Sequence, residues 1–183
     1  MRTPAWYAVL LALVGLERLR ELAISKRHER ARGGTRAASR TFPLMVAAHI
    51  GLFTLPLLEA STGDRRRPSL AWGAVLVAAT GLRIWSIRSL GSAWNVRGAV
   101  PHDFVPVESG PYRYIRHPNY LAVILEFLAV PLIAGAWVSA LLLSAVNAFV
   151  IADRIAEEER LLNQSSSYRR AFAQRARFVP HVF

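Results

Sequence analysis

The chain contains no cysteine and few acidic residues. Among its 183 residues, only 12 are Asp or Glu, against 23 Lys and Arg. The absence of cysteine excludes a disulfide framework, a zinc ribbon, an iron–sulfur cluster and a thiolate nucleophile. Charged residues make up 19% of the chain, below the share of about 25% that is typical of soluble domains. Because hydrophobic residues make up 53% and occur in long blocks, the composition predicts a membrane protein.

The excess of basic residues has two interpretations. The net charge is +11, and 22 of the 23 basic residues are arginine. In a soluble protein this excess would suggest nucleic-acid binding. Here the arginines cluster between apolar blocks, so they indicate membrane topology and contact with anionic membrane lipids. We therefore expect no nucleic-acid partner.

Apolar blocks predict five helices, and the expected fold is an all-α membrane domain over residues 1–183. The expected helices cover residues 4–22, 42–60, 70–87, 119–134 and 137–162. A bilayer crossing takes about 20 apolar residues. The last two helices form a hairpin whose apolar arms, about 16 residues each, measure roughly 24 Å at 1.5 Å per residue. This hairpin is short for a full crossing.

The connections between the helices predict an orientation. Most Lys and Arg residues fall between the first and second helices, between the third and fourth, and in the tail 163–183. Cytoplasmic connections are enriched in Lys and Arg, so we expect these segments and the C-terminus in the cytoplasm. The N-terminus would lie outside, in a bacterial plasma membrane. Arg65, Arg66 and Arg67 favour the opposite orientation but are fewer.

The polar stretch 90–118 is the first candidate for a functional site. Loops of this length inside a compact domain are usually functional. Gly110-Pro111 indicates a turn, and Pro118 stands at the first turn of a helix, where proline is tolerated. Arg116 and His117 therefore precede a helix N-terminus, whose amide groups favour an anionic ligand group.

A second polar group lies at the end of the last predicted helix. Glu157, Glu158 and Glu159 point in three directions around that helix, and Arg154 can pair with Glu158 one turn away. If one glutamate faces the loop, the site combines donors with a carboxylate and suits a zwitterionic, nucleotide-like ligand. The spacing alone favours the alternative, which is a solvated helix end.

Together, the two segments resemble the isoprenylcysteine carboxyl methyltransferase family, which includes phospholipid methyltransferases. The resemblance lies in Gly110-Pro111-Tyr112, the run Arg116-His117-Pro118-Asn119-Tyr120, and Glu158-Glu159 one helical hairpin later. It implies S-adenosylmethionine as methyl donor, bound between the loop and the C-terminal helix, and a lipophilic acceptor that enters from the bilayer. The cofactor-binding residues that it implies are Tyr112, Arg113, Arg116, His117, Pro118, Tyr120, Glu158 and Glu159. Tyr112 and Tyr120 are equally expected as interfacial belt residues.

Looser motifs resemble a bacterial branch of this family that is associated with type III polyketide synthases. Its members are thought to O-methylate alkylpyrones or phenolic lipids. The motifs are Arg20-Glu21-Leu22, Ser25-Lys26-Arg27, the run Phe42 to Val46 with His49, Leu90-Gly91 to Trp94, and Asn119-Tyr120 with Glu126. One departure is Ala122, where family members often have glycine.

Three residues are candidates for the reaction itself, and none of the patterns indicates a metal site. Arg154 near an acceptor oxygen would stabilise a developing anion. Glu126 is ionisable within an apolar helix, which is by default a functional hypothesis. It would either contact the acceptor or pair with Arg83 or His49. His49 is either a buried hydrogen-bonding residue or a general base.

Two alternatives come from other classes of protein. One is a membrane reductase of sterol-reductase-like architecture that uses NADPH, although five helices leave little room for its larger bundle. The other is a small non-enzymatic membrane protein, which would not need both motifs. The tail alternates arginine with aromatic residues and predicts an amphipathic helix on anionic lipid. The oligomeric state stays open.

Overall fold

The computed structural model describes residues 5–33, 35, 39–62, 67–100 and 104–180. These residues form six α-helices: α1 (Ala5–Arg32), α2 (Phe42–Thr62), α3 (Leu70–Leu90), α4 (Pro118–Ile133), α5 (Trp137–Leu162) and α6 (Ser166–Phe172). Two short 3-10 helices, η1 (Gly91–Ala93) and η2 (Gly110–Arg113), lie in the connection between α3 and α4. In the described ranges no strand is present beyond one isolated bridge between Thr35 and Val100. The predicted all-α fold is confirmed.

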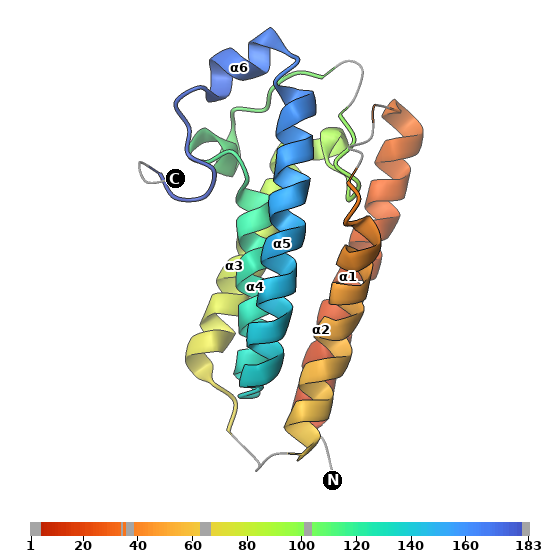
Figure 1. The fold of residues 1–183 in the computed structure, drawn as a ribbon, viewed down its shortest axis with the longest axis vertical. Helices are drawn as coiled ribbons and strands as arrows, with labels where there is room; N and C mark the ends of the chain where they lie inside the picture. The colour runs from red at the N-terminus through yellow and green to blue at the C-terminus, as the bar shows by residue number, and fades with distance from the viewer. Residues whose placement is uncertain (1–4, 34, 36–38, 63–66, 101–103, 181–183) are drawn as a thin grey trace.

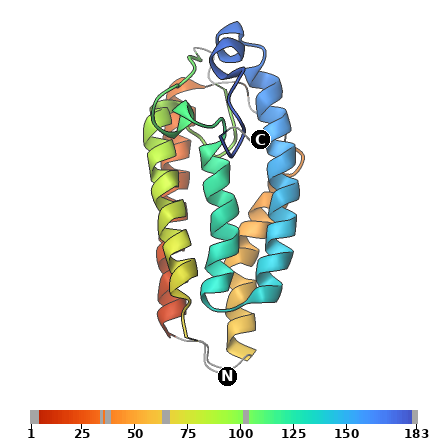
Figure 2. The same ribbon diagram turned by 90° about the vertical axis from the view of Figure 1, so that its left-hand side faces the viewer.

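The five long helices run alternately up and down along one axis (Figures 1 and 2). The C-terminal ends of α1, α3 and α5 therefore lie at the same end of the bundle. The connections after them gather there, together with α6. We call this the loop end, formed by the described residues of 33–41, 91–117 and 163–180. The alternation explains why the three arginine-rich segments share one end.

Among the described residues, three helices are long and apolar enough to cross a membrane: α2, the segment Leu70–Ala93 that contains α3, and α5. The apolar helix α4 is shorter, with 16 residues, as expected for one arm of the short hairpin. Large apolar side chains are exposed along the bundle, among them Leu13, Val77 and Leu141. Such a surface suits lipid rather than water, since soluble monomers rarely expose extended apolar surface.

The predicted end of the first helix, residue 22, is wrong because α1 continues to Arg32. Its second half is rich in Glu, Arg and Lys, which are good helix formers, and Glu21 and Glu29 there pair with Arg83 and Arg97. The predicted start at Pro4, and the topology arginines Arg36, Arg65 and Arg66, lie outside the described residues.

Helix α1 is attached to the bundle mainly through side chains. Tyr7 is fully buried and donates a hydrogen bond from its hydroxyl to the carbonyl oxygen of Val130 on α4, at 3.0 Å. Further along, Arg18 reaches Glu126 on α4, and Glu21 reaches Arg83 on α3. In contrast, α4 packs directly against both α3 and α5. These long side-chain links leave space between α1 and the rest of the bundle.

Candidate active site

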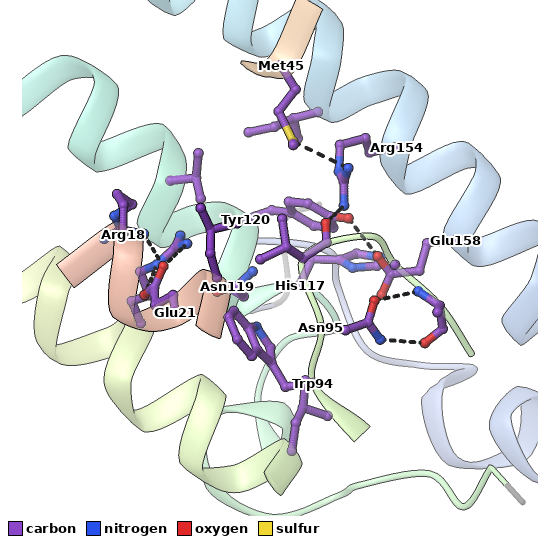
Figure 3. Close-up of a pocket in the computed structure, with 18 of the residues that line it drawn as sticks. Arg18, Glu21, Met45, Trp94, Asn95, His117, Asn119, Tyr120, Arg154 and Glu158 are labelled. Carbon is purple, nitrogen blue, oxygen red and sulfur yellow. Dashed lines mark hydrogen bonds and ion pairs between the residues drawn. The ribbon is translucent and has the colours of Figure 1, made fainter. Parts of the chain in front are cut away.

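A cavity of about 730 Å³ occupies the space between α1, α2, α4 and α5 and continues beneath the loop end. Its half toward the membrane interior is lined mostly by apolar side chains, such as Leu16, Ile50 and Phe53. Toward the loop end the lining becomes polar and aromatic. Figure 3 shows this part, with Trp94, His117, Tyr120 and Glu158 drawn together from segments far apart in the sequence. The molecule thus joins an apolar chamber to a polar one.

Of the three consecutive glutamates near the end of α5, Glu158 is the one that lines the cavity. Its carboxylate accepts a hydrogen bond from the hydroxyl of Tyr120 on α4, at 2.6 Å. Of the three glutamates, Glu157 instead pairs with Arg160 on the surface, at 3.1 Å. The structure therefore contradicts the alternative of a merely solvated helix end, because Glu158 has a partner inside the bundle.

Glu159 has a different position and holds the C-terminal segment in place. It lies 3.0 Å from His117 Nε2, 3.2 Å from Arg116 Nη1 and 2.7 Å from Arg177 Nη2. Backbone hydrogen bonds join the same two segments, because the amides of Arg116 and His117 donate to the carbonyls of Ala176 and Arg177. We call residues 173–180 the strap. Glu159 therefore joins α5, the start of α4 and the strap.

The loop over the cavity is anchored from two sides. The guanidinium of Arg154 donates to the carbonyl of Val96 at 2.6 Å and contacts the sulfur of Met45 at 3.3 Å. From α1, Ser25 accepts a hydrogen bond from the amide of Val96, and His28 bonds the carbonyl of Trp94. Arg154 makes these contacts in place of the predicted pair with Glu158. Its guanidinium is directed at the loop and lies over the Tyr120 ring, 5.9 Å from the ring centroid.

An aromatic cluster closes the loop end of the cavity. Tyr112, Tyr168 and Phe172 are buried and pack with Leu162, and the rings of Tyr168 and Phe172 are stacked with centroids 4.8 Å apart. Burial raises the pKa of Tyr112, and the nearby carboxylate of Glu158 raises it further. The phenol of Tyr112 therefore stays protonated at physiological pH.

The tail differs from the predicted amphipathic helix on lipid. Only Ser166–Phe172 is helical, and its apolar residues pack on the protein instead of projecting toward a membrane. The reason is that Tyr112 and Leu162 offer an apolar surface directly beneath it. Arg169 and Arg170 remain exposed.

The remaining predicted site residues fall into two groups. His49 and Arg154 line the cavity. His49 bonds the carbonyl of Met45 through Nδ1, at 2.8 Å, and packs edge-on against Phe127. Glu126, Arg113 and Pro118 are not among the lining residues. Glu126 pairs with Arg18 and Arg83, Arg113 is exposed, and Pro118 is buried in the first turn of α4.

A buried ionic cluster lies deeper in the protein, and sequence reasoning predicted one part of it, the alternative in which Glu126 pairs with Arg83, but missed the rest. The cluster consists of Arg18 and Glu21 on α1, Arg83 on α3 and Glu126 on α4, and Glu17 lies at its edge. Arg18, Glu21 and Arg83 line the cavity. One feature of the sequence could have indicated this cluster: ionisable residues within apolar helices are costly, so each of them is by default a candidate functional residue. Only Glu126 was singled out on that basis.

The turn at Gly110 provides a test of how rigidly the loop end is built. Gly110 has φ +61°, and an added Cβ would meet Ser89 Oγ and lie 3.0 Å from Trp85 Nε1. We expect Gly110→Ala to lower the free energy of unfolding by at least about 2 kcal/mol, since a left-handed alanine alone costs about 1–2 kcal/mol. Thermal unfolding in detergent measures this. The control is Gly81→Ala on α3, where the space is open and alanine favours the helix; equal losses for both variants would contradict the expectation.

These features define a class of protein: an all-α integral membrane protein whose cavity is polar at one end and apolar at the other. The chain belongs to the isoprenylcysteine carboxyl methyltransferase family, whose model matches residues 72–164. This match includes both the loop motif and the double glutamate, so the chain is a membrane methyltransferase by family.

Two relatives extend the similarity over most of the chain. The Bacillus subtilis protein YpbQ is 32% identical over 164 residues, which cover 86% of this chain and 97% of YpbQ. A Haemophilus influenzae protein is 28% identical over 163 residues, which cover 86% of this chain and 92% of that protein. Both are described as uncharacterized proteins. The similarity therefore includes helices outside the matched family segment but names no acceptor.

Proposed function

We propose that the protein is an S-adenosylmethionine-dependent methyltransferase that O-methylates a lipophilic acceptor, such as an alkylpyrone, a phenolic lipid or an isoprenylcysteine-like carboxylate. The observation that carries the proposal is the continuity of one cavity, from Glu158 and His117 at the loop end to an apolar chamber between the membrane helices. The polar part suits a nucleotide-like methyl donor, and the apolar part suits a lipid tail. The family membership supports methyl transfer as the reaction.

The residues at the loop end fit the chemical groups of S-adenosylmethionine. Glu158 offers a carboxylate for the amino group or the ribose hydroxyls. Arg116 has a buried Nε atom without a hydrogen-bond partner, which suits the carboxylate of the donor. The aromatic cluster of Tyr112, Tyr168 and Phe172 offers ring faces for adenine. Donors, an acceptor and an apolar surface are thus present together, as a zwitterionic nucleoside requires.

When bound, S-adenosylmethionine would supply the methyl group from its sulfonium: the acceptor oxygen would gain the C–O bond, the S–C bond would break to leave a thioether, and the proton of a hydroxyl acceptor would leave to bulk solvent. The protein's part is to align the two substrates and exclude water, and alignment supplies up to about 7–11 kcal/mol in well-oriented reactions. Tyr120 fixes Glu158 from α4, while Arg154 holds the loop residues 94–96 over the cavity. The strap closes the same end through Glu159.

The apolar chamber offers a path from the bilayer between α1 and α2. Leu16 and Leu19 on α1 and Ile50 on α2 line the cavity, yet each is at least 60% exposed at the surface. A side chain can line the cavity and also be exposed at the protein surface only where the cavity opens to that surface. We infer that the acceptor enters laterally here, with its tail remaining among apolar side chains.

The same proposal includes the orientation. With the loop end in the cytoplasm of a bacterial cell, the polar part of the cavity would face the compartment that supplies the methyl donor. The arginine-rich segments of the loop end support this orientation, because cytoplasmic segments near a membrane are enriched in Lys and Arg.

Blocking the lateral path tests the entry route. We expect Ile50→Trp to lower kcat/KM for a lipid acceptor by at least about 10-fold, equivalent to 1.4 kcal/mol, while S-adenosylhomocysteine still binds. The matched control is Leu58→Trp on the same helix, since Leu58 is 62% exposed but does not line the cavity. Unchanged kcat/KM in the Ile50 variant would contradict lateral entry at this point.

The acceptor class is tested by methyl transfer from a radiolabelled donor to four purified acceptors in nanodiscs. These are an alkylpyrone, an alkylphenol, a prenylcysteine and a phosphatidylethanolamine. The proposal predicts labelled methyl ether or ester on at least one oxygen acceptor. Label only on the phospholipid amine, or on none of the four, would contradict O-methylation.

A further inference from the structure

A second cavity lies beside the main one at the loop end, and we call it the side cavity. It measures about 390 Å³ and is bounded by one face of α1, the first residue of α2 and the loop after η1. In Figure 1, the end of α1 and the start of α2 both lie at the loop end. Leu22 and Val96 line both cavities. These two residues therefore stand between the side cavity and the main cavity.

Positive charge dominates the lining of the side cavity. Lys26, Arg30 and Arg97 contribute three cations, and Glu29 contributes one carboxylate. Glu29 accepts a hydrogen bond from Ser25 Oγ at 3.0 Å and lies 3.9 Å from Arg97 Nε, so it offsets one of the three positive charges. Among the described residues, no carboxylate forms an ion pair with Lys26 or Arg30. The side cavity therefore suits an anion.

The surroundings of the side cavity favour a phospholipid over a free anion. Leu22 at its edge and Leu19, one turn deeper along α1, are exposed apolar side chains. Phe42 adds an aromatic ring, which lies 5.0 Å from the guanidinium carbon of Arg97. A phosphate between the cations would leave its acyl chains beside these apolar side chains. Basic pockets between membrane helices bind anionic lipid head groups in this way.

The side cavity is also connected to the loop over the main cavity. The amide of Val96 donates to Ser25 on α1, and its carbonyl accepts from Arg154 on α5. Arg97 follows directly in the chain, so an anion bound by Arg97 and by the cations of α1 would tie the loop to α1 a second time. Because Val96 stands between the two cavities, a lipid head group in the side cavity is not the methyl acceptor.

We propose that the side cavity binds the phosphate of an anionic phospholipid between Lys26, Arg30 and Arg97, and that this lipid holds the loop residues 94–97 in place over the main cavity. The lipid is a fixed ligand and is not consumed. The binding site itself does not depend on the reaction that the protein catalyses. The effect on the loop rests on the proposed function, because it predicts tighter binding of the methyl donor when anionic lipid is present.

The experiment on the lipid site compares the double variant Lys26→Gln/Arg30→Gln with wild type and with the control Arg20→Gln/Arg27→Gln. Both variants remove two exposed positive charges from α1, but Arg20 and Arg27 do not line the side cavity. Titration with phosphatidylglycerol in detergent, followed by native mass spectrometry, measures the affinity for the lipid. We expect this affinity to fall at least about 10-fold in Lys26→Gln/Arg30→Gln, equivalent to 1.4 kcal/mol, and to stay at the wild-type level in the control. Equal affinity in the two variants would overturn the site.

Calorimetric titration with S-adenosylhomocysteine tests the effect on the loop. The wild type should bind this ligand about 5-fold more tightly in nanodiscs of phosphatidylcholine with phosphatidylglycerol than in phosphatidylcholine alone, which is the lower end of typical coupling between two sites. The difference should disappear in Lys26→Gln/Arg30→Gln. Inorganic phosphate added to phosphatidylcholine nanodiscs should not replace the lipid, because it lacks acyl chains.

The possible results separate this proposal from the proposed function. An equal effect of inorganic phosphate would overturn a lipid as the occupant. Equal affinity of the wild type for S-adenosylhomocysteine in the two membranes would overturn the effect on the loop. Absence of S-adenosylhomocysteine binding in both membranes would overturn the proposed function, whereas the lipid titration would still decide the site.

Discussion

Glu158→Gln is expected to weaken S-adenosylhomocysteine binding about 10- to 100-fold and to lower kcat/KM by at least as much. Hydrogen bonds to charged groups contribute about 1.5–3 kcal/mol, and Glu158 is the acidic residue of the helix end that lines the cavity. Glutamine keeps an oxygen that can accept from Tyr120, so the bond between α4 and α5 is preserved. The substitution therefore removes charge from the ligand site with little effect on the fold. Calorimetric titration measures the change.

The matched control is Glu157→Gln, one residue earlier on the same helix. Glu157 pairs with Arg160 on the surface, where both side chains are partly exposed, and such pairs contribute little. This variant should bind S-adenosylhomocysteine as wild type does. Equal affinity in both variants would remove Glu158 from the site.

Glu159→Gln is expected to release the strap from the bundle. Glu159 is the shared partner of Arg116, His117 and Arg177, and glutamine removes its charge while leaving those donors in place. We expect a loss of about 2 kcal/mol in unfolding free energy, the scale of one charged hydrogen bond. S-adenosylhomocysteine affinity should fall by at least about 10-fold, as 1.4 kcal/mol would produce, because the loop end is no longer closed.

Limited trypsin digestion gives a direct readout of strap release. Cleavage after Arg175 and Arg177 should become faster in Glu159→Gln than in wild type, as judged by mass spectrometry of the released C-terminal peptides. The Glu157→Gln protein again provides the control. Wild-type cleavage rates together with wild-type affinity in Glu159→Gln would contradict the assignment of Glu159 as the holder of the strap.

The sequence predicted much of this fold because apolar blocks and turn residues are local signals. The positions of Gly110 and Pro118 correctly placed a turn and a helix start before and after Arg116 and His117. The double glutamate correctly indicated that α5 contributes to the same end of the bundle. These features depend on residues close together in the chain, or on the alternation of helices in a membrane.

The sequence could not predict which glutamate faces the cavity or which charges pair. Glu158 and Glu159 are separated by about 100° around the helix, and their partners come from α4 and the strap. Likewise, Arg18 and Glu126 are 108 positions apart yet lie 2.9 Å from each other. Such pairings depend on how helices rotate and pack. Of the two roles expected for Glu126, contact with the acceptor or a pair with Arg83 or His49, the structure shows the pair with Arg83, and Arg18 is a second partner that the sequence did not indicate.

The most direct test of the methyltransferase assignment is calorimetric titration of the purified wild-type protein in nanodiscs with S-adenosylhomocysteine. The account predicts saturable binding at one site per chain, lost or strongly weakened in Glu158→Gln and retained in Glu157→Gln. Absence of saturable binding by folded wild-type protein would contradict it.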